Sequence, residues 1–312
     1  MPRVSVVTAT CNRPQRLAAL LDSLRAQTLR DFEVVVVDDA STDATPRLLA
    51  EEQARGGLDL RVVRREVNGG QAAARNDGWR AAAAPIVAFT DDDCVARPTW
   101  LEAGLAAIAA APDGAVVQGR TDPIEDELDR YGPYSTTHWI HAAGPWFETC
   151  NIFYPRALLE RLGGFDADAF ARWGGEDTDL AWRAIEAGAA VAYAPGARVR
   201  HAVHVLGPVG RLRFAARAGQ TMRVFARHPE LRRRHAIRGL FWKWSHYRLA
   251  LLLAALVLPR RLWPLHLLLG APYIAYEAQR SGKALAPYVL LHDLVEMGAA
   301  AHGSLRDGRL IL

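Results

Sequence analysis

The sequence predicts an α/β fold, with a mostly parallel, Rossmann-like sheet flanked by helices and a C-terminal helical segment. Over residues 1 to about 120, short β-branched runs alternate with helical periodicity, which is typical of parallel strands joined by helices. From residue 206 onward the chain is first Arg-rich and then aliphatic, in stretches of helical length. We therefore expect an α/β domain over 1–205 and a basic, apolar helical region over 206–312.

The elements of the α/β domain are predicted in chain order. The continuous β-branched run Glu33–Asp38 indicates a strand buried on both faces. Pro14 marks a helix start, and Ser41 and Asp43 are typical helix caps. The other predicted strands cover 4–8, 61–63, 86–90 and 115–117, and further helices cover 71–83 and 100–110. After an irregular segment over 120–150, we expect helices over 156–162 and 176–186 and short strands over 191–193 and 198–201.

Composition places the chain among globular proteins. It has 312 residues, half of them hydrophobic, which is enough for one good core and a second small unit. No apolar leader segment opens the sequence, so we expect no signal peptide. Its three cysteines are widely spaced and form no metal-binding or disulfide pattern. We interpret the chain as a reduced, cytoplasmic protein.

Charge is distributed unevenly along the chain. Between Arg211 and Arg248, ten Arg and Lys243 face only Glu230, which gives +10. Because the whole chain carries +4, the rest carries −6. This asymmetry indicates an anionic partner, either membrane lipid or nucleic acid.

Two apolar stretches follow the basic segment, Leu249–Leu258 and Leu262–Tyr276. Neither reaches the roughly 20 residues that span a bilayer. They fit core helices, or an interfacial or re-entrant pair flanked by Trp and Arg. Peripheral contact with anionic lipid at the inner face of the plasma membrane is therefore a hypothesis.

Three consecutive carboxylates, Asp91, Asp92 and Asp93, follow the predicted strand 86–90. Like charges this close need a compensating cation to stay ionised, and a hard divalent ion is the usual one. A solvated turn is the alternative explanation, because Asp favours turns.

Polar clusters also follow the other predicted strands. In open α/β sheets, ligands bind beyond the carboxyl ends of the strands, so four such clusters indicate a binding site. The three further clusters are Thr8–Arg13, Asp38–Ser41 and Asn68–Gly70.

Four blocks in this order resemble the motifs of glycosyltransferase family 2, the inverting enzymes of GT-A fold. They are VVDDASTD (36–43), NGGQAAARN (68–76), FTDDD (89–93) and GGEDTDLAWR (174–183). The resemblance covers residues 3–205. It implies an enzyme that transfers a sugar from a nucleotide donor.

The resemblance implies a donor site at the first strand ends. Thr8, Asn12 and Arg13 would line the nucleotide pocket, and Asp39 would hold the base or ribose. The paired glycines Gly69 and Gly70 would let the backbone approach the ligand closely.

The later blocks imply the metal and phosphate contacts. Arg75 would face the donor phosphate or buttress Asp91, with a structural salt bridge as the alternative. Asp91 would touch the ribose or sugar, Asp93 would bind the metal, and Asp92 could replace either. His201 resembles the histidine that some GT-A enzymes add to the metal; His204 competes with it, and a structural role is the alternative.

Acceptor activation needs a positioned base. By resemblance Asp177 is that base, while Glu176 and Trp173 are the expected acceptor contacts. Capping of the helix that begins at Glu176 is the alternative role for these acids.

We thus expect a metal-dependent transferase, using Mn²⁺ or Mg²⁺, that moves a sugar from a nucleotide-sugar donor, with UDP-sugars favoured, to a glycan or lipid-linked acceptor. A nucleotidyltransferase is the first alternative, but Thr8–Arg13 lacks the glycines of such a loop. A non-catalytic module that binds anionic ligands is the second. No nucleic-acid motif accompanies the Arg run, so we expect no nucleic-acid partner.

Overall fold

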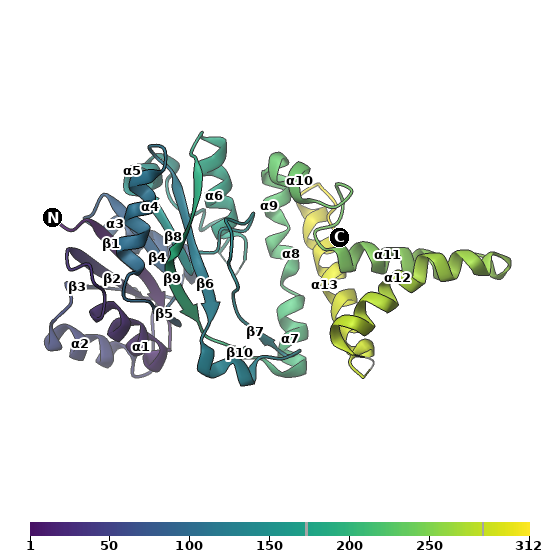
Figure 1. The fold of residues 1–312 in the computed structure, drawn as a ribbon, viewed down its shortest axis with the longest axis horizontal. Helices are drawn as coiled ribbons and strands as arrows, with labels where there is room; N and C mark the ends of the chain where they lie inside the picture. The colour runs from purple at the N-terminus through teal and green to yellow at the C-terminus, as the bar shows by residue number, and fades with distance from the viewer. Residues whose placement is uncertain (172–173, 283) are drawn as a thin grey trace. The chain divides into compact units, whose positions relative to one another are not determined.

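The computed structural model describes residues 1–171, 174–282 and 284–312 (Figure 1). The chain divides into two compact units. The first, called the sheet unit, contains Met1–Tyr131 and Thr136–His204. The second, called the helical unit, contains Gly132–Ser135 and Val205–Leu312.

The sheet unit alternates strands and helices. Its strands are β1 (Val4–Thr10), β2 (Phe32–Asp38), β3 (Leu60–Arg64), β4 (Ile86–Thr90), β5 (Cys94–Ala96), β6 (Val116–Pro123), β8 (Asn151–Pro155) and β9 (Val191–His201). Its helices are α1 (Pro14–Arg25), α2 (Thr45–Arg55), α3 (Gly70–Ala81), α4 (Trp100–Ala110), η1 (Glu125–Arg130), α5 (Arg156–Leu162) and α6 (Glu176–Glu186). The short strands β7 (Ser135–Thr136) and β10 (His204–Val205) pair separately.

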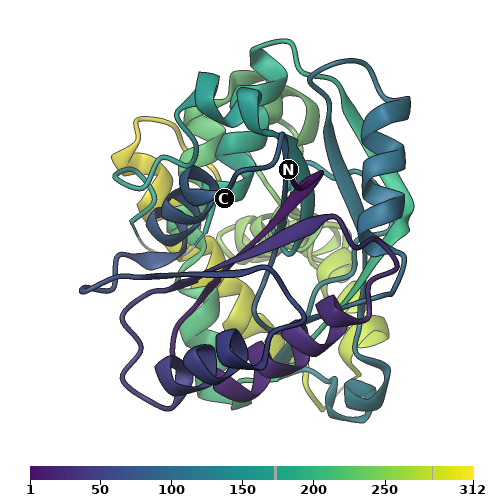
Figure 2. The ribbon, with the colours of Figure 1, turned by 90° about the vertical axis from the view of Figure 1, so that its left-hand side faces the viewer.

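The eight strands form one sheet in the order β3-β2-β1-β4-β8-β6-β9-β5. β3, β2, β1 and β4 run parallel, as do β6 and β9. β8 is antiparallel to both neighbours, and β5 is antiparallel to β9. Figure 2 shows the twist of the N-terminal strands, drawn in purple. The predicted α/β fold with a mostly parallel sheet is confirmed.

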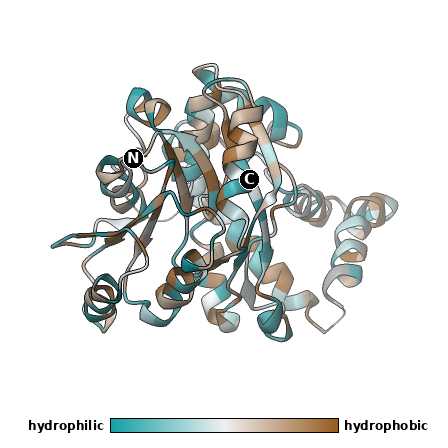
Figure 3. Cartoon of the chain, turned by 60° about the vertical axis from the view of Figure 1, so that its left-hand side comes forward, coloured by the Kyte–Doolittle hydropathy of each residue, from teal (hydrophilic) through white to brown (hydrophobic). Residues whose placement is uncertain are grey.

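Helices cover both faces of this sheet because successive strand residues point to opposite sides. On one face, Leu17, Leu20 and Leu21 of α1 pack with Val4 and Val34. On the other face, α3 approaches closely at Gly78, where an added Cβ would lie 2.5 Å from Val7. In Figure 3 the strands of this sheet carry long hydrophobic stretches, coloured brown. The core of the sheet unit is therefore apolar, with Val and Leu packed around aromatic side chains such as Trp100 and Phe153.

Three predicted details of the sheet unit were wrong or incomplete. The two short strands expected over 191–193 and 198–201 are one strand, β9, whose pairing with β6 shifts register between Gly119 and Arg120. Strand β6 continues to Pro123, inside the segment expected to be irregular. Strands β5 and β8 were not predicted, because β5 has only three residues and β8 ends the segment that we expected to be irregular.

The helical unit contains α7 (Gly207–Ala215), α8 (Ala218–Thr221), α9 (Arg223–Arg227), α10 (Pro229–His235), α11 (Trp244–Leu256), η2 (Arg260–Leu262), α12 (Trp263–Ser281) and α13 (Ala286–Arg306). Figure 1 shows α11 and α12 side by side as a helical hairpin. Helix α13 packs closely on α8, where a Cβ at Gly303 would lie 2.2 Å from the Gly219 carbonyl oxygen. None of the helices in the described parts of the chain combines the length and apolar character of a bilayer-spanning segment.

Candidate active site

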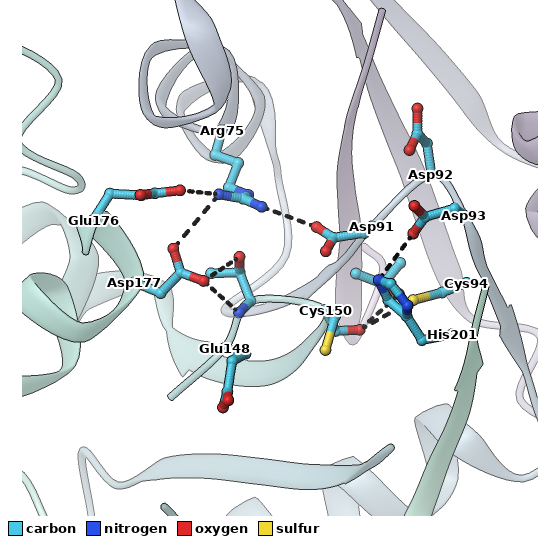
Figure 4. A network of polar contacts seen from close by, with 12 residues as sticks. Arg75, Asp91, Asp92, Asp93, Cys94, Glu148, Cys150, Glu176, Asp177 and His201 are labelled. Carbon is cyan, nitrogen blue, oxygen red and sulfur yellow. Dashed lines mark hydrogen bonds and ion pairs between the residues drawn. The ribbon is translucent and has the colours of Figure 1, made fainter. Parts of the chain in front are cut away.

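The three carboxylates that follow β4 point in three directions (Figure 4). The side chains of Asp92 and Asp93 are almost fully buried, whereas Asp91 is partly exposed. Each carboxylate therefore has its own partners. The burial of Asp92 and Asp93 contradicts the alternative of a solvated turn.

Asp91 belongs to a network centred on the buried side chain of Arg75, from α3. Arg75 Nη2 donates to Asp91 Oδ1 at 2.9 Å, and Nη1 donates to Glu176 Oε1 at 3.1 Å. Asp177 Oδ1 lies 3.7 Å from the same Nη1. Burial would lower the pKa of the Arg75 guanidinium, but the three carboxylates raise it, so the side chain stays charged. One cation thus joins the end of β4 to the start of α6.

Asp92 faces the end of β1. Its Oδ2 accepts a hydrogen bond from Thr10 Oγ1 at 2.7 Å, and its Oδ1 accepts one from Arg13 Nη1 at 3.1 Å. Burial raises the pKa of Asp92 to about 7, with Asp93 adding to the shift and Arg13 opposing it. Asp92 is therefore poised to hold a proton near neutral pH.

Asp93 faces two histidines, and strand pairing explains why. Cys94 of β5 lies opposite His201 in β9, so the residue before Cys94 comes beside that imidazole. Asp93 Oδ1 lies 3.3 Å from His201 Nε2, and Oδ2 lies 2.8 Å from His204 Nε2. Burial alone would raise the pKa of Asp93, but the hydrogen bond from His204 and the charge of Arg13 hold it well below its usual range.

The pair Asp93 and His201 fits a divalent metal. His201 Nδ1 lies 2.8 Å from the Ala202 carbonyl oxygen, which only accepts, so Nδ1 carries the proton and Nε2 presents a lone pair. Burial lowers the pKa of His201 and favours this neutral form. Among the residues that the structure describes, Asp93 Oδ1 accepts no hydrogen bond. Two lone pairs 3.3 Å apart, with the imidazole held by a backbone carbonyl, are typical of a metal site.

Cys94 also lies within reach of this pair. Burial raises the pKa of its thiol well above the usual value, so the sulfur stays protonated. A neutral thiol is a poor ligand, and hard ions prefer carboxylate oxygen. His204, which the sequence offered as a competitor of His201, also contacts Asp93, so the structure brings both histidines to the same carboxylate.

Asp177 is held at the start of α6 by Thr149. Its Oδ2 accepts hydrogen bonds from Thr149 N–H and Thr149 Oγ1, both at 3.0 Å. The side chain of Asp177 is 21% exposed, whereas that of Glu176 is 5% exposed. Asp177 is thus the more exposed acid of this pair.

Glu176 lies deeper in the same network. Burial and the neighbouring charge of Asp177 raise its pKa to about 8, although Arg75 opposes the shift. Glu148, one residue before Thr149, has a pKa raised by burial and by Asp177, with His138 opposing. The site therefore holds protonatable carboxyl groups beside an accessible one.

A second cluster lies at the ends of β2 and β3. Asp39 accepts hydrogen bonds from the backbone N–H groups of Gly69 and Gly70 at 3.0 and 2.9 Å, and it pairs with Arg65 at 2.8 Å. Gly70 has φ +82°, and an added Cβ would lie 2.9 Å from the Ala171 carbonyl oxygen. Glycine is needed here both for the backbone angle and for the close approach.

The remaining predicted residues occupy different environments. Asn12, with φ +57°, accepts hydrogen bonds from Thr42 N–H and Asp43 N–H and so ties the end of β1 to the segment after β2. The side chain of Thr8 is fully buried within β1, and its place in a nucleotide pocket stays a prediction. Trp173 lies outside the described residues.

Sequence reasoning missed Thr149 as the residue that positions Asp177. The only signal was a polar residue just before the unpredicted strand β8. Thr10 was part of a polar cluster, but its hydrogen bond to Asp92 depends on the parallel pairing of β1 with β4.

Solved structures share this fold. The mannosyltransferase PcManGT from Pyrobaculum calidifontis, in complex with GDP-Man and Mn²⁺, covers 98% of this chain and 88% of its own at TM-score 0.60 and 24% identity. TarS from S. aureus, in complex with UDP-GlcNAc, covers 99% and 93% at TM-score 0.56 and 18% identity. At these identities the likeness shows the fold, which is that of a GT-A glycosyltransferase.

Sequence relatives point the same way. Validoxylamine A glucosyltransferase from Streptomyces hygroscopicus subsp. jinggangensis is 36% identical, over 59% of this chain and 51% of its own. Pre-mycofactocin glycosyltransferase from Mycobacterium tuberculosis is 31% identical, over 73% and 48%. This chain spans about half the length of the curated relatives it matches.

The sequence model described as "Glycosyl transferase family 2" matches residues 5–171, more than half of the chain. A second model, "N-terminal domain of galactosyltransferase", matches residues 139–205. The chain belongs to glycosyl transferase family 2.

Proposed function

We propose that the protein transfers a sugar from a nucleotide-sugar donor to a glycan or lipid-linked acceptor, with inversion at the anomeric carbon and with a divalent metal. The carrying observation is the convergence of Arg75, Asp91, Asp93, Asp177 and His201 at one edge of the sheet. These residues come from four elements far apart in the sequence, and ligands of open α/β sheets bind at this edge.

Asp177 is the proposed general base. It is the more exposed acid of the Glu176–Asp177 pair, and Thr149 fixes one of its oxygens. In the proposed step an acceptor hydroxyl gives its proton to Asp177 while its oxygen bonds to the anomeric carbon. The bond from that carbon to the phosphate oxygen breaks, and the nucleoside diphosphate leaves with the electron pair.

Asp93 and His201 are the proposed metal ligands, with His204 as a further candidate. A bound cation would neutralise charge on the leaving diphosphate. Carboxylate and imidazole together suit Mn²⁺ better than Mg²⁺, which prefers oxygen ligands. Arg75 is the proposed positioning residue, since its pairs with Asp91 and with Glu176 support a buttress.

Donor contacts are proposed for Thr8, Asn12, Arg13, Asp39, Gly69 and Gly70, with Asp91 or Asp92 near the ribose or sugar, and acceptor contacts for Trp173 and Glu176. Uridine is the first base to test, and guanosine the second, because one structural neighbour is a complex with UDP-GlcNAc and another with GDP-Man. A lipid-linked acceptor would require work at a membrane, so peripheral contact with anionic lipid is part of this proposal.

The first experiment is a thermal-shift screen of UDP, GDP and their sugars, with and without Mn²⁺. A ligand that binds the native state raises its melting temperature by mass action. We expect a shift that needs both the metal and one nucleotide, that Asp93→Ala abolishes, and that Asp113→Ala, at an exposed loop acid, retains. If no nucleotide shifts the wild-type protein under any metal condition, the donor site as proposed is wrong.

Catalysis is tested separately with the donor so identified. Asp177→Asn keeps the shape of the side chain but cannot accept the proton. We expect nucleotide release to fall roughly 10²- to 10⁴-fold while the thermal shift with donor is retained. A variant that turns over at the wild-type rate would remove Asp177 from the role of base.

A further inference from the structure

Helices α11 to α13 bury polar side chains. The described buried residues of α13 are His292, Asp293, Glu296, Ala300 and Ser304, only one of them apolar. In an ordinary water-soluble helix the buried stripe is apolar. The polarity of this helix is therefore inverted.

The buried polar groups are paired with one another. Lys243, which precedes α11, donates to both carboxylate oxygens of Glu296 at 2.6 Å, and His246 Nε2 lies 3.2 Å from Glu296 Oε2. Tyr273 of α12 donates to Asp293 at 3.3 Å. Side-chain atoms of His246, Asp293 and Glu296 lie within 4.8 Å of one another, so all three helices contribute to one charged network, with the partly exposed Lys243 at its edge.

The same helices expose large apolar side chains. At the tip of the α11–α12 hairpin, both helices expose apolar side chains, and so does Val257 in the turn between them. The large apolar side chains most exposed on the hairpin include Leu256, Val257, Trp263, Leu267, Leu268 and Ile274. Exposed apolar side chains gathered on one hairpin are typical of an interaction surface.

Charge indicates what covers this surface. Residues 231–276 contain eight Lys and Arg and no Asp or Glu, although Arg233 and Arg234 pair with Glu230 and Lys243 pairs with Glu296. Two of them, Arg260 and Arg261, lie in the turn of the hairpin among the exposed Leu, Val and Trp. A second copy of the chain would bring these cations together without carboxylates from this segment, whereas an anionic lipid surface would pair with them.

We propose that the α11–α12 hairpin, with the exposed face of α13, inserts into the interface of a bilayer that contains anionic lipid. Apolar side chains would enter the headgroup and acyl boundary, Trp263 and the two turn arginines would lie at headgroup level, and the charged network would stay inside the protein. The inference rests on the proposed function in one respect, the lipid-linked acceptor that such a position would serve.

The test is flotation of the full chain with vesicles of phosphatidylcholine, alone or with an equal part of phosphatidylglycerol. We expect flotation with phosphatidylglycerol that weakens at high salt. Arg260→Gln with Arg261→Gln should lower the partition coefficient roughly 10- to 30-fold at low salt. Failure of the wild-type chain to float with either vesicle would overturn the proposal.

Matched variants distinguish insertion of the hairpin from nonspecific binding of the protein to vesicles. Val257→Asp with Leu267→Asp places charges on the hairpin and should reduce binding at least about 100-fold. Val67→Asp with Leu128→Asp changes the same residue types at exposed positions of the sheet unit and should leave binding unchanged. Equal loss in both variants would contradict the proposal.

Two further readouts complete the experiment. A concentration-dependent dimer in lipid-free ultracentrifugation, abolished by the hairpin variant, would show that a second copy covers the face and would overturn the proposal. Sugar release from the donor, measured without vesicles, reports on the proposed function alone. A chain that floats without turnover contradicts only the proposed function, and one that turns over without floating contradicts only the insertion.

Discussion

The sheet unit and the helical unit bury different kinds of side chain. Strands β1, β2 and β4 bury Val, Ala and Phe along their length, and carboxylates follow the ends of β2 and β4, while Glu33 is buried near the start of β2. Helices α11 to α13 bury His, Asp and Glu and expose Leu. In the first unit one group of buried charges forms the candidate site, while others such as Glu33 and Asp179 lie elsewhere, and in the second unit buried charges form part of the core.

This difference separates two sources of stability. Burial of apolar surface stabilises the sheet unit in water, roughly in proportion to the area removed from solvent. A buried ionic network stabilises little by itself, but it becomes costly when one partner is missing. The stability of the helical unit should therefore depend on charge and pH, whereas that of the sheet unit should depend on the volume of its buried side chains. Within the sheet unit, the buried ion pairs of Arg75 are the exception.

The largest loss of stability is expected when Arg75 is replaced. Arg75→Met would leave Asp91, Glu176 and Asp177 without their shared cation, and we expect a loss of about 3–5 kcal/mol in the free energy of unfolding. Denaturant unfolding measures it. Arg75→Lys, which keeps the charge, should lose less.

A combined variant sharpens this result. Adding Asp91→Asn and Glu176→Gln to Arg75→Met removes two of the three carboxyl groups that lost their shared cation, so most of the lost stability should return. If Arg75→Met is as stable as the wild type, the buried network does not govern stability in the sheet unit.

An intermediate effect is expected at Glu296. Burial would raise its pKa, but the hydrogen bond from His246 and the charge of Lys243 lower it from the usual 4.5 to about 2. The depressed pKa adds stability above pH 4.5 that is lost as the pH falls towards 2. We expect about 3 kcal/mol of acid-dependent stability from this group.

Denaturant unfolding followed across this pH range measures the loss. Glu296→Gln should be less stable at neutral pH and should lack the Glu296 part of the acid dependence. The same acid dependence in wild type and variant would show that other carboxyl groups cause it.

The smallest effect is expected on the hairpin surface. Leu267 is 60% exposed, so Leu267→Ala should change the free energy of unfolding by no more than about 0.5 kcal/mol in lipid-free buffer. Leu20 in α1 is fully buried, and Leu20→Ala should cost about 2–5 kcal/mol. A large loss at Leu267 would mean that the hairpin surface is packed in solution, and the comparison would fail.

Much of the sheet unit could be predicted because local sequence determines it. The β-branched run 33–38 became β2, and the helices expected over 156–162 and 176–186 have those bounds in the structure. The strands β5 and β8 could not be predicted, because each exists only through antiparallel pairing with residues distant in the sequence.

The same limit applies to the candidate site. Sequence blocks indicated Arg75, Asp91 and Asp177, but the shared guanidinium that joins them is a property of the folded sheet. Thr149 carried no motif, and its hydrogen bonds to Asp177 depend on where β8 begins. In the helical unit, apolar stretches were evident in the sequence, but the inverted burial of α13 depends on which face of each helix meets its neighbours.

The pairing of β5 with β9 has a consequence for how this chain can vary. The register that sets Cys94 opposite His201 is a short backbone ladder, so it fixes the spacing of Asp93 and His201 independently of the length of chain between them. A slip by one residue would turn the paired side chains to the opposite face. Insertions and deletions in the exposed turns between these strands can therefore accumulate over evolution without disturbing the two side chains, whereas a single inserted residue within Cys94–Ala96 would separate them.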